Sequence, residues 1–341
     1  MVKVARQIIS WTSISIGGRG NGRVHNDKSS GDCREPRNIL VIGGSGFLSG
    51  TIARSAVAAG HRTWVVTRGQ RPVPEGVTSL IADRHDRDAF AAVVAAENTH
   101  WDAVIDCIAY EPEDMRQNLD VLSTLASQLV FISTDFVFDP TRRSFPQPVE
   151  APYTELDDYG GKKRQCELIL LDGDTGAMEW TILRPCHIYG PGSQLGCLPL
   201  HGRDPDLIRR IQLGETLRLV GGGHFLQQPI FVRDLAAIAL SAIGNSRAFG
   251  QIYCTAGPDI IESRRYYEIV GEVLGLQVSI EEVPVTQALA DDPTRLPFYC
   301  HRIYSLDRFA EHGLHVPAVP IEDGLREHTE SLLAAASTQQ N

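Results

Sequence analysis

The chain has 341 residues, enough for about two domains or for one large core with an added lobe. Its 43% hydrophobic and 22% charged residues are ordinary for a globular protein. A formal net charge of -10 disfavours a general nucleic-acid or anionic-membrane binder, because such proteins present a basic face. No apolar run approaches the roughly 18 residues that a membrane helix requires. We therefore expect a cytoplasmic protein with no membrane and no nucleic-acid partner.

Cysteine and histidine spacing argues against both disulfides and metals. The seven cysteines are an odd number, lie far apart and include no C-x-x-C pair, which is typical of reduced thiols. Several histidines also lack the spacing of metal ligands: His61, His85, His100, His201 and His224. We expect no metal site.

Residues 1–36 differ in composition from the rest of the chain. They are basic and contain serine and glycine, and no acidic residue precedes Asp27. An organelle transit peptide, a disordered tail and an upstream start codon all fit this composition. The glycine-rich run from Gly17 to Gly22 cannot sustain an amphipathic helix, which favours a disordered extension.

The strongest local pattern follows this extension. The apolar run Ile39 to Ile42 predicts a strand buried on both faces, and glycines follow it at once. A helix is expected from Thr51 to Ala59. This order forms a phosphate cradle, since glycines admit a pyrophosphate and the helix N-terminus offers free N–H groups. The spacing Gly43-x-x-Gly46-x-x-Ser49 departs from G-x-G-x-x-G, because serine replaces the third glycine.

Strand and helix patterns then alternate. Strands are expected at Thr63–Thr67, Leu80–Asp83, Ala103–Ala109, Leu129–Ser133 and Trp180–Pro185, with helices at Asp88–Ala96 and Glu113–Ser127. Such alternation predicts an α/β Rossmann-type doubly wound parallel sheet. We assign residues 37–186 to this dinucleotide-binding domain, with its sheet completed by segments around 228–255. Residues 187–341 would form mainly a smaller α+β substrate lobe.

The end of the second strand bears on the choice of cofactor. In dinucleotide folds an acidic residue there binds the ribose 2′-hydroxyl, whereas an arginine suits a 2′-phosphate. Here Arg68 follows Thr67, which favours NADP(H), with NAD(H) as the alternative.

Candidate catalytic side chains follow the fifth strand. Thr134 stands at its carboxyl end, where its hydroxyl could hold a substrate carbonyl oxygen. Tyr159 and Lys163 are four residues apart on an expected helix and share one face of it. An ammonium beside a phenol is expected to lower the phenol pKa from about 10 and so to prepare it for acid–base catalysis.

As an ordered set, these motifs resemble the extended short-chain dehydrogenase/reductase family of the NAD-dependent epimerase/dehydratase type. The resemblance covers roughly residues 37–333 and includes the Leu183-Arg184-Pro185 and Tyr189-Gly190-Pro191-Gly192 runs. The run from Ser133 to Asp139 is most similar to dTDP-4-dehydrorhamnose reductases. The 4,6-dehydratases carry a glutamate where this chain has Phe136, so a dehydratase of that type is not expected.

The resemblance implies roles for individual residues. Tyr159 would be the general acid/base, Lys163 would hold the nicotinamide ribose, and Thr134 would orient the carbonyl. Cofactor contacts would come from the glycine loop and three strand ends: Gly43, Gly46, Phe47, Leu48, Asp83, Arg84, Cys107, Ile108, Ala109 and Pro185.

Substrate contacts are expected from the C-terminal part. Family members usually have asparagine where this chain has His187, which puts ordinary nucleotide-sugar contacts in doubt. His187 could bind substrate or donate a proton, or it could be a packed structural histidine. Gln228 and Arg233 are further candidates for the substrate pocket.

These patterns predict an NAD(P)-dependent oxidoreductase. It would transfer hydride to or from a secondary alcohol or ketone of a sugar nucleotide or similar polyhydroxylated small molecule. A nucleotide-sugar epimerase with retained NAD is the alternative within the family. The alternative from another class is a non-catalytic dinucleotide-sensing or RNA-associated protein. A homodimer is also possible, through the helix that carries Cys166, Leu168, Ile169 and Leu170.

Overall fold

A seven-stranded parallel sheet forms the centre of the fold in a computed structural model that describes residues 35–150, 152–197 and 203–339. Its strands are β1 Asn38–Ile42, β2 Arg62–Thr67, β3 Thr78–Ile81, β4 Ala103–Asp106, β5 Gln128–Ile132, β6 Glu179–Pro185 and β11 Gln251–Thr255. Their order is β11-β6-β5-β4-β1-β2-β3. The order reverses between β1 and β4, and ligands bind at such switch points.

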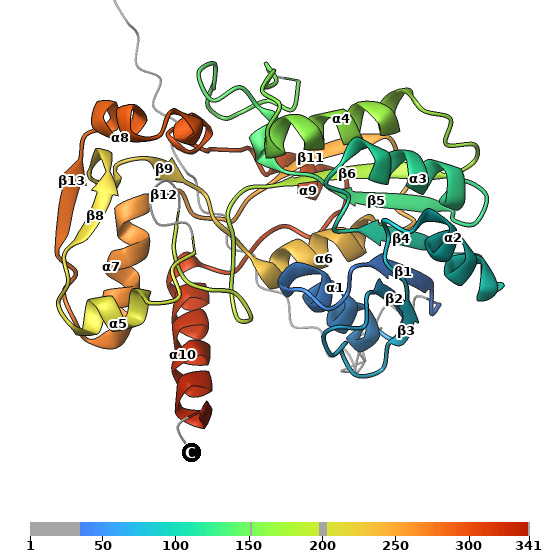
Figure 1. The fold of residues 1–341 in the computed structure, drawn as a ribbon, viewed down its shortest axis with the longest axis horizontal. Coiled ribbons are helices and arrows are strands. Elements are labelled where there is room, and N and C mark those ends of the chain that lie inside the picture. Colours follow the sequence, from blue (N-terminus) through green and yellow to red (C-terminus); the bar gives the residue numbers. More distant parts are fainter. Residues whose placement is uncertain (1–34, 151, 198–202, 340–341) are drawn as a thin grey trace, which may run out of the picture. The chain divides into compact units, whose positions relative to one another are not determined.

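Helices cover both faces of this sheet (Figure 1). Helices α1 Phe47–Ala58 and α6 Val232–Ala242 pack on one face, and α2 Arg87–Ala96, α3 Pro112–Leu122 and α4 Tyr159–Asp172 on the other. The side chains of β1 from Ile39 to Ile42 are all apolar because both faces of the strand are buried. Ile39 and Val41 belong to the hydrophobic core on one face of the sheet, and Leu40 and Ile42 to the core on the other. The predicted doubly wound Rossmann-type fold is confirmed.

A smaller α+β part follows β6. It contains three short strand pairs, β7 Ile188–Tyr189 with β10 Ile230–Phe231, β8 Leu217–Val220 with β13 Ile280–Val283, and β9 Leu226–Gln227 with β12 Ile261–Glu262. Its helices include α5 Leu207–Gln212, α7 Ser263–Leu274, α8 Val285–Asp291 and α10 Ile321–Gln339. Helix α9 Asp307–Glu311 returns to the first core of the main sheet through Phe309. This arrangement brings late segments of the chain to the ends of the main strands.

Two element boundaries differ from the sequence-based expectation. Helix α1 begins at Phe47, four residues before the predicted start, because Gly46 already serves as its N-cap. The helix therefore follows the glycine turn directly. In the segment around 228–255 that we expect to complete the sheet, β10 spans only Ile230–Phe231, since α6 begins at Val232.

Other expectations concern membranes, thiols and assembly. Within the described ranges, no helix is both long and apolar enough to cross a membrane. The six cysteines there are free thiols, and no cluster of three acidic, cysteine or histidine side chains could hold a metal. On α4, the helix expected to form a dimer interface, Cys166 and Leu170 are buried in the core of their own chain, whereas Leu168 is exposed. The homodimer remains a prediction. The predicted extension at 1–36 lies almost wholly outside the described residues, as does His201.

Candidate active site

Two adjoining cavities lie at the carboxyl ends of the central strands. The larger has a volume of about 460 Å³ and the smaller about 390 Å³. Four residues line both of them: Gly46, Ser49, Ile108 and Tyr110. A single elongated ligand could therefore pass from one cavity to the other along the N-terminus of α1.

The glycine loop forms the wall between β1 and α1. Gly43 and Gly44 have φ of +118° and +91°, which side-chain-bearing residues rarely adopt. A Cβ on Gly44 would lie 2.4 Å from the Val65 side chain, so the turn also needs glycine for space. Ser49 stands where the dehydrogenase pattern has its third glycine, and its Oγ accepts a hydrogen bond from the Gly46 N–H at 3.2 Å. The loop exposes backbone to both cavities, as a dinucleotide pyrophosphate requires.

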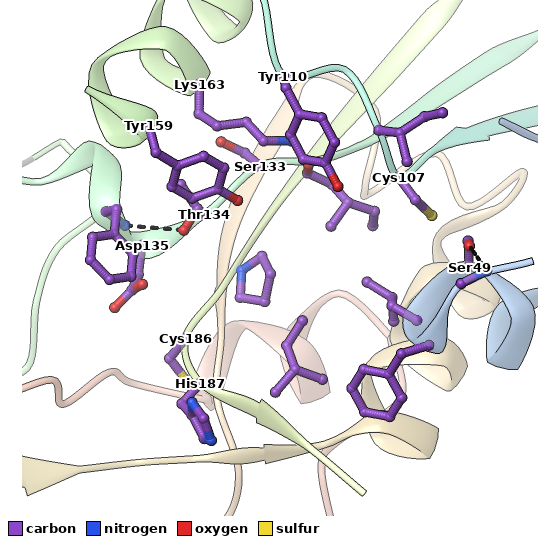
Figure 2. Close-up of a pocket in the computed structure, with 18 of the residues that line it drawn as sticks. Ser49, Cys107, Tyr110, Ser133, Thr134, Asp135, Tyr159, Lys163, Cys186 and His187 are labelled. Atoms are coloured by element: carbon purple, nitrogen blue, oxygen red, sulfur yellow. Dashed lines mark hydrogen bonds between the residues drawn. The ribbon is translucent and has the colours of Figure 1, made fainter. Parts of the chain in front are cut away.

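The three predicted catalytic residues line the larger cavity together. Figure 2 shows Tyr159 and Lys163 approaching it from α4, with Thr134 beside the Tyr159 ring. Thr134 lies two residues after β5 and caps the 3-10 helix η1 Asp135–Val137 by accepting a hydrogen bond from the Phe136 N–H. The strand end and the helix face thus place a hydroxyl, a phenol and an ammonium around one space.

Lys163 is almost completely buried. Its ammonium donates a hydrogen bond to the Ile132 carbonyl at 2.8 Å and lies 4.8 Å from the ring centres of both Tyr110 and Phe131. Burial lowers its pKa to about 8, although the negative charge of Asp106 opposes this shift.

The prediction that Lys163 lowers the Tyr159 pKa is wrong for this structure. Partial desolvation of its phenol in the cavity raises the Tyr159 pKa to about 12, although about half of the residue's surface is exposed, and the neighbouring phenol of Tyr110 adds to the rise. A side-chain hydrogen bond with Thr134 works in the opposite direction. The ammonium points at the Ile132 carbonyl instead, so Tyr159 stays protonated near neutral pH and is suited to donate a proton.

His187 also lines the larger cavity. Burial lowers its pKa to about 3, and the nearby charge of Arg203 contributes. Its ring packs edge-on against Tyr266 with 6.1 Å between ring centres. The imidazole is therefore neutral at physiological pH and can offer a hydrogen bond but not a charge.

The predicted cofactor residues are divided between the cavities. Phe47, Leu48, Cys107 and Pro185 line the larger one, with Gly46 and Ile108. Those of the smaller cavity are Gly43, Gly46, Arg68, Asp83, Arg84 and Ile108.

Arg84 lines the smaller cavity but its charge is already compensated. Its guanidinium is buried and forms ion pairs with Asp106 at 2.9 Å and with Asp114 at 3.1 Å. The exposed Arg68 and Arg71, by contrast, have no acidic partner among the described side chains. These two arginines are the cations that a ligand phosphate in this cavity would meet.

Three predicted site residues lie outside both cavities. Ala109 is fully buried behind the strand end. Gln228 is buried and bridges two main-chain groups. Its Nε2 donates a hydrogen bond to the Gly257 carbonyl at 2.9 Å, and its Oε1 accepts one from the Tyr304 N–H at 2.8 Å. Arg233 pairs with Glu327 on the exposed surface. These three residues were predicted in the site from their positions in the sequence. In the structure their side chains instead pack or pair within the surrounding fold.

Several residues that line the cavities are not among those predicted from the sequence. Tyr110 directly follows the strand expected at Ala103–Ala109, and its position at a strand end could have indicated it. Arg203 and Phe298 line the larger cavity from the C-terminal part. Nothing local in their sequence predicts this, because it depends on how that part folds back.

Strand order, glycine turn and adjoining cavities together are those of a dinucleotide-binding α/β fold. Comparison with known proteins supports this class. The model of the NAD dependent epimerase/dehydratase family matches residues 39–254. The chain therefore belongs to this family, as the resemblance predicted, and is of the extended short-chain dehydrogenase/reductase type.

Individual relatives are distant. The chain is 25% identical to chloroplast stem-loop binding protein of 41 kDa b from Arabidopsis thaliana, over 65% of this chain and 59% of that protein. It is 28% identical to 2'-dehydrokanamycin reductase from Streptomyces kanamyceticus, over 73% of this chain and 70% of the reductase. The UDP-glucose 4-epimerase of Thermotoga maritima has a similar fold, with a TM-score of 0.70, 18% identity and coverage of 88% and 99%.

Proposed function

We propose that the protein is an NADPH-dependent reductase of a ketone in a sugar nucleotide or a similar polyhydroxylated small molecule. One observation carries the proposal: Thr134, Tyr159 and Lys163 surround a cavity that adjoins a second cavity bearing Arg68 and Arg71. The relative named as a 2'-dehydrokanamycin reductase supports a reductase.

The chain's own residues suit this reaction. Thr134 would hold the carbonyl oxygen beside Tyr159, and Tyr159 would donate its proton to that oxygen. Its raised pKa favours the protonated phenol, as reduction requires. Lys163 would hold a ribose hydroxyl through its ammonium. A bound nicotinamide cofactor supplies the hydride.

The residues of the two cavities fit such a cofactor. The glycine turn offers backbone without Cβ atoms, and the N-terminus of α1 favours a pyrophosphate. Arg68 and Arg71 would face a 2′-phosphate in the smaller cavity, which favours NADP(H) over NAD(H).

Two alternatives have support from the relatives. The similarity to UDP-glucose 4-epimerases favours an epimerase that retains NAD and returns hydride to the opposite face. The relative named as a stem-loop binding protein favours an RNA-associated protein, although the match spans only 59% of it. Strongly salt-dependent RNA retention that does not change in Tyr159→Phe would support this last function.

The test begins with denaturing the purified protein and identifying any released dinucleotide by mass. NADPH and NADH are then titrated into the empty protein, for the wild type, Arg68→Ala and Arg62→Ala. Arg62 is an exposed arginine at the start of β2, the strand that Arg68 follows, and it lies outside both cavities. We expect tighter NADPH binding, weakened roughly tenfold or more by Arg68→Ala alone. Released NAD would instead support the epimerase, and binding of neither nucleotide would refute the enzyme.

A further inference from the structure

Two phenylalanines from distant parts of the chain meet in the larger cavity. Phe136 lies in η1, and Phe298 ends the 3-10 helix η3 Pro293–Phe298. Their ring centres are 5.1 Å apart with an interplanar angle of 67°, and both rings line the cavity. We call this pair the aromatic wall.

The aromatic wall stands next to the proposed proton donor. The Phe136 ring centre is 6.2 Å from that of Tyr159, at an interplanar angle of 70°. In Figure 2 Asp135, Thr134 and Tyr159 lie together, on the opposite side of the view from Ser49 and Cys107. The glycine-loop end of the cavity would hold the cofactor, so the wall belongs to the end left for substrate.

Arg302 holds the two halves of the wall together from behind. Its guanidinium forms an ion pair with Asp135, the residue before Phe136, and donates to the carbonyl of Pro297, the residue before Phe298, at 2.6 Å. It also stacks over the Phe136 ring at 4.4 Å. The wall is therefore preformed, because one buried side chain fixes both of its segments.

The same contacts compensate the charge of Arg302 behind the wall. Asp135 is buried and also accepts a hydrogen bond from the Tyr304 hydroxyl at 2.6 Å. The positive charge of Arg302 and the negative charge of Asp135 thus compensate each other within the protein. Asp135 and Arg203 also line the cavity, and beside Tyr159 the two rings of the wall add hydrocarbon surface to it.

We propose, on the basis of the function proposed above, that the aromatic wall selects ketones whose reacting carbon belongs to a ring. A ring presents a flat C–H surface that stacks on a fixed aromatic face, as an aromatic ring does. An open chain would lose rotational freedom in order to make the same contact. The wall orients the ring so that its carbonyl oxygen reaches Thr134 and Tyr159.

Binding of two six-carbon probes tests this inference without depending on turnover. Cyclohexanone and hexan-2-one are titrated into the NADP⁺-loaded protein, with binding followed by ligand-observed NMR. We expect cyclohexanone to bind more tightly, and Phe298→Ala to weaken it roughly two- to tenfold while hexan-2-one changes little. Phe298→Leu, which keeps an apolar side chain, should weaken cyclohexanone by a similar factor.

Phe225→Ala is the matched control. Phe225 is a part-buried phenylalanine of the same lobe that packs on Tyr299 and His301, outside both cavities. Thermal unfolding of each variant confirms that it is folded. Three results would overturn the proposal that the aromatic wall selects ring ketones: equal binding of the two ketones, no binding of either, or an effect of Phe225→Ala equal to that of Phe298→Ala. Failure of NADPH oxidation with every ketone would refute the reductase instead, since the binding arm does not require it.

Discussion

Glu167 on α4 and Arg184 on β6 form a completely buried ion pair, with 2.8 Å between Oε2 and Nη2. Arg184 also donates through Nε to the other carboxylate oxygen at 2.8 Å, which makes the pair bidentate. The Ser133 hydroxyl donates to Glu167 at 2.6 Å, so the residue before Thr134 is turned away from catalysis. Since Glu167 lies one turn after Lys163 on the same helix, this network fixes α4 against the strand end that bears Thr134.

Glu167→Ala is therefore expected to destabilise the protein strongly. It leaves the Arg184 guanidinium buried without its carboxylate, and removing one partner of a buried pair costs about 3–5 kcal/mol. Urea unfolding measures the loss. Glu113→Ala is the control, because Glu113 pairs with Arg116 on the surface and should contribute less than about 1 kcal/mol. Similar losses in the two variants would contradict the role of the buried pair.

Tyr159→Phe is expected to reduce turnover in NADPH-dependent ketone reduction by about 10²–10⁴-fold. The variant removes the proton donor but keeps the ring that packs near Phe136 and Tyr110. NADPH affinity should change little. Tyr299→Phe, which removes a hydroxyl outside both cavities, is the control. Retained turnover in Tyr159→Phe would mean that another group donates the proton.

The pH dependence of stability should report on Lys163. Its pKa is lowered from 10.5 to about 8 in the folded protein, so between these values the unfolded state binds more protons. The free energy of unfolding should therefore rise with pH from about 8 to 10.5, by at most about 1.4 kcal/mol per pH unit. Below pH 8 the cost of burying the ammonium is fully present. Urea unfolding at a series of pH values measures the slope.

Lys163→Met isolates this contribution. The charges of Asp106 and Arg84 act on Lys163, as do the thiols of Cys107 and Cys166. Burial raises the pKa of both thiols, and that of Cys166 reaches about 12, so they stay neutral in this window. The wild type should gain stability relative to Lys163→Met as pH rises. A constant difference across the window would show that the ammonium is not desolvated.

Gly44→Ala is expected to impair both stability and dinucleotide binding. At φ of +91° a side chain is strained, and its Cβ would also lie 2.4 Å from the Val65 side chain. Gly60→Ala is the control, since Gly60 has a similar φ of +83° but nothing within 4 Å of the added Cβ. Gly60→Ala should cost roughly 1–2 kcal/mol, and Gly44→Ala about 1–3 kcal/mol more. Thermal unfolding and NADPH titration measure the two effects, and equal values would show that the loop relaxes around the methyl group.

The sequence by itself determined the parts of this protein that depend on neighbouring residues. The apolar run of β1 indicated burial on both faces, because its side chains alternate between the two cores. The glycines of the first turn indicated a phosphate cradle, since only backbone without Cβ fits there. Helical spacing likewise placed Tyr159 and Lys163 on one face of α4, and both line the larger cavity.

Only the tertiary structure decided which distant groups face the site and which charges are already compensated. Phe298 and Arg302 reach the turn after β5 from more than 150 residues away in the chain, and no local periodicity encodes such a contact. Arg84 turned out to be paired within the core, and Gln228 to bridge main-chain groups. The direction of the Tyr159 pKa shift also depends on burial, which a one-dimensional spacing does not contain.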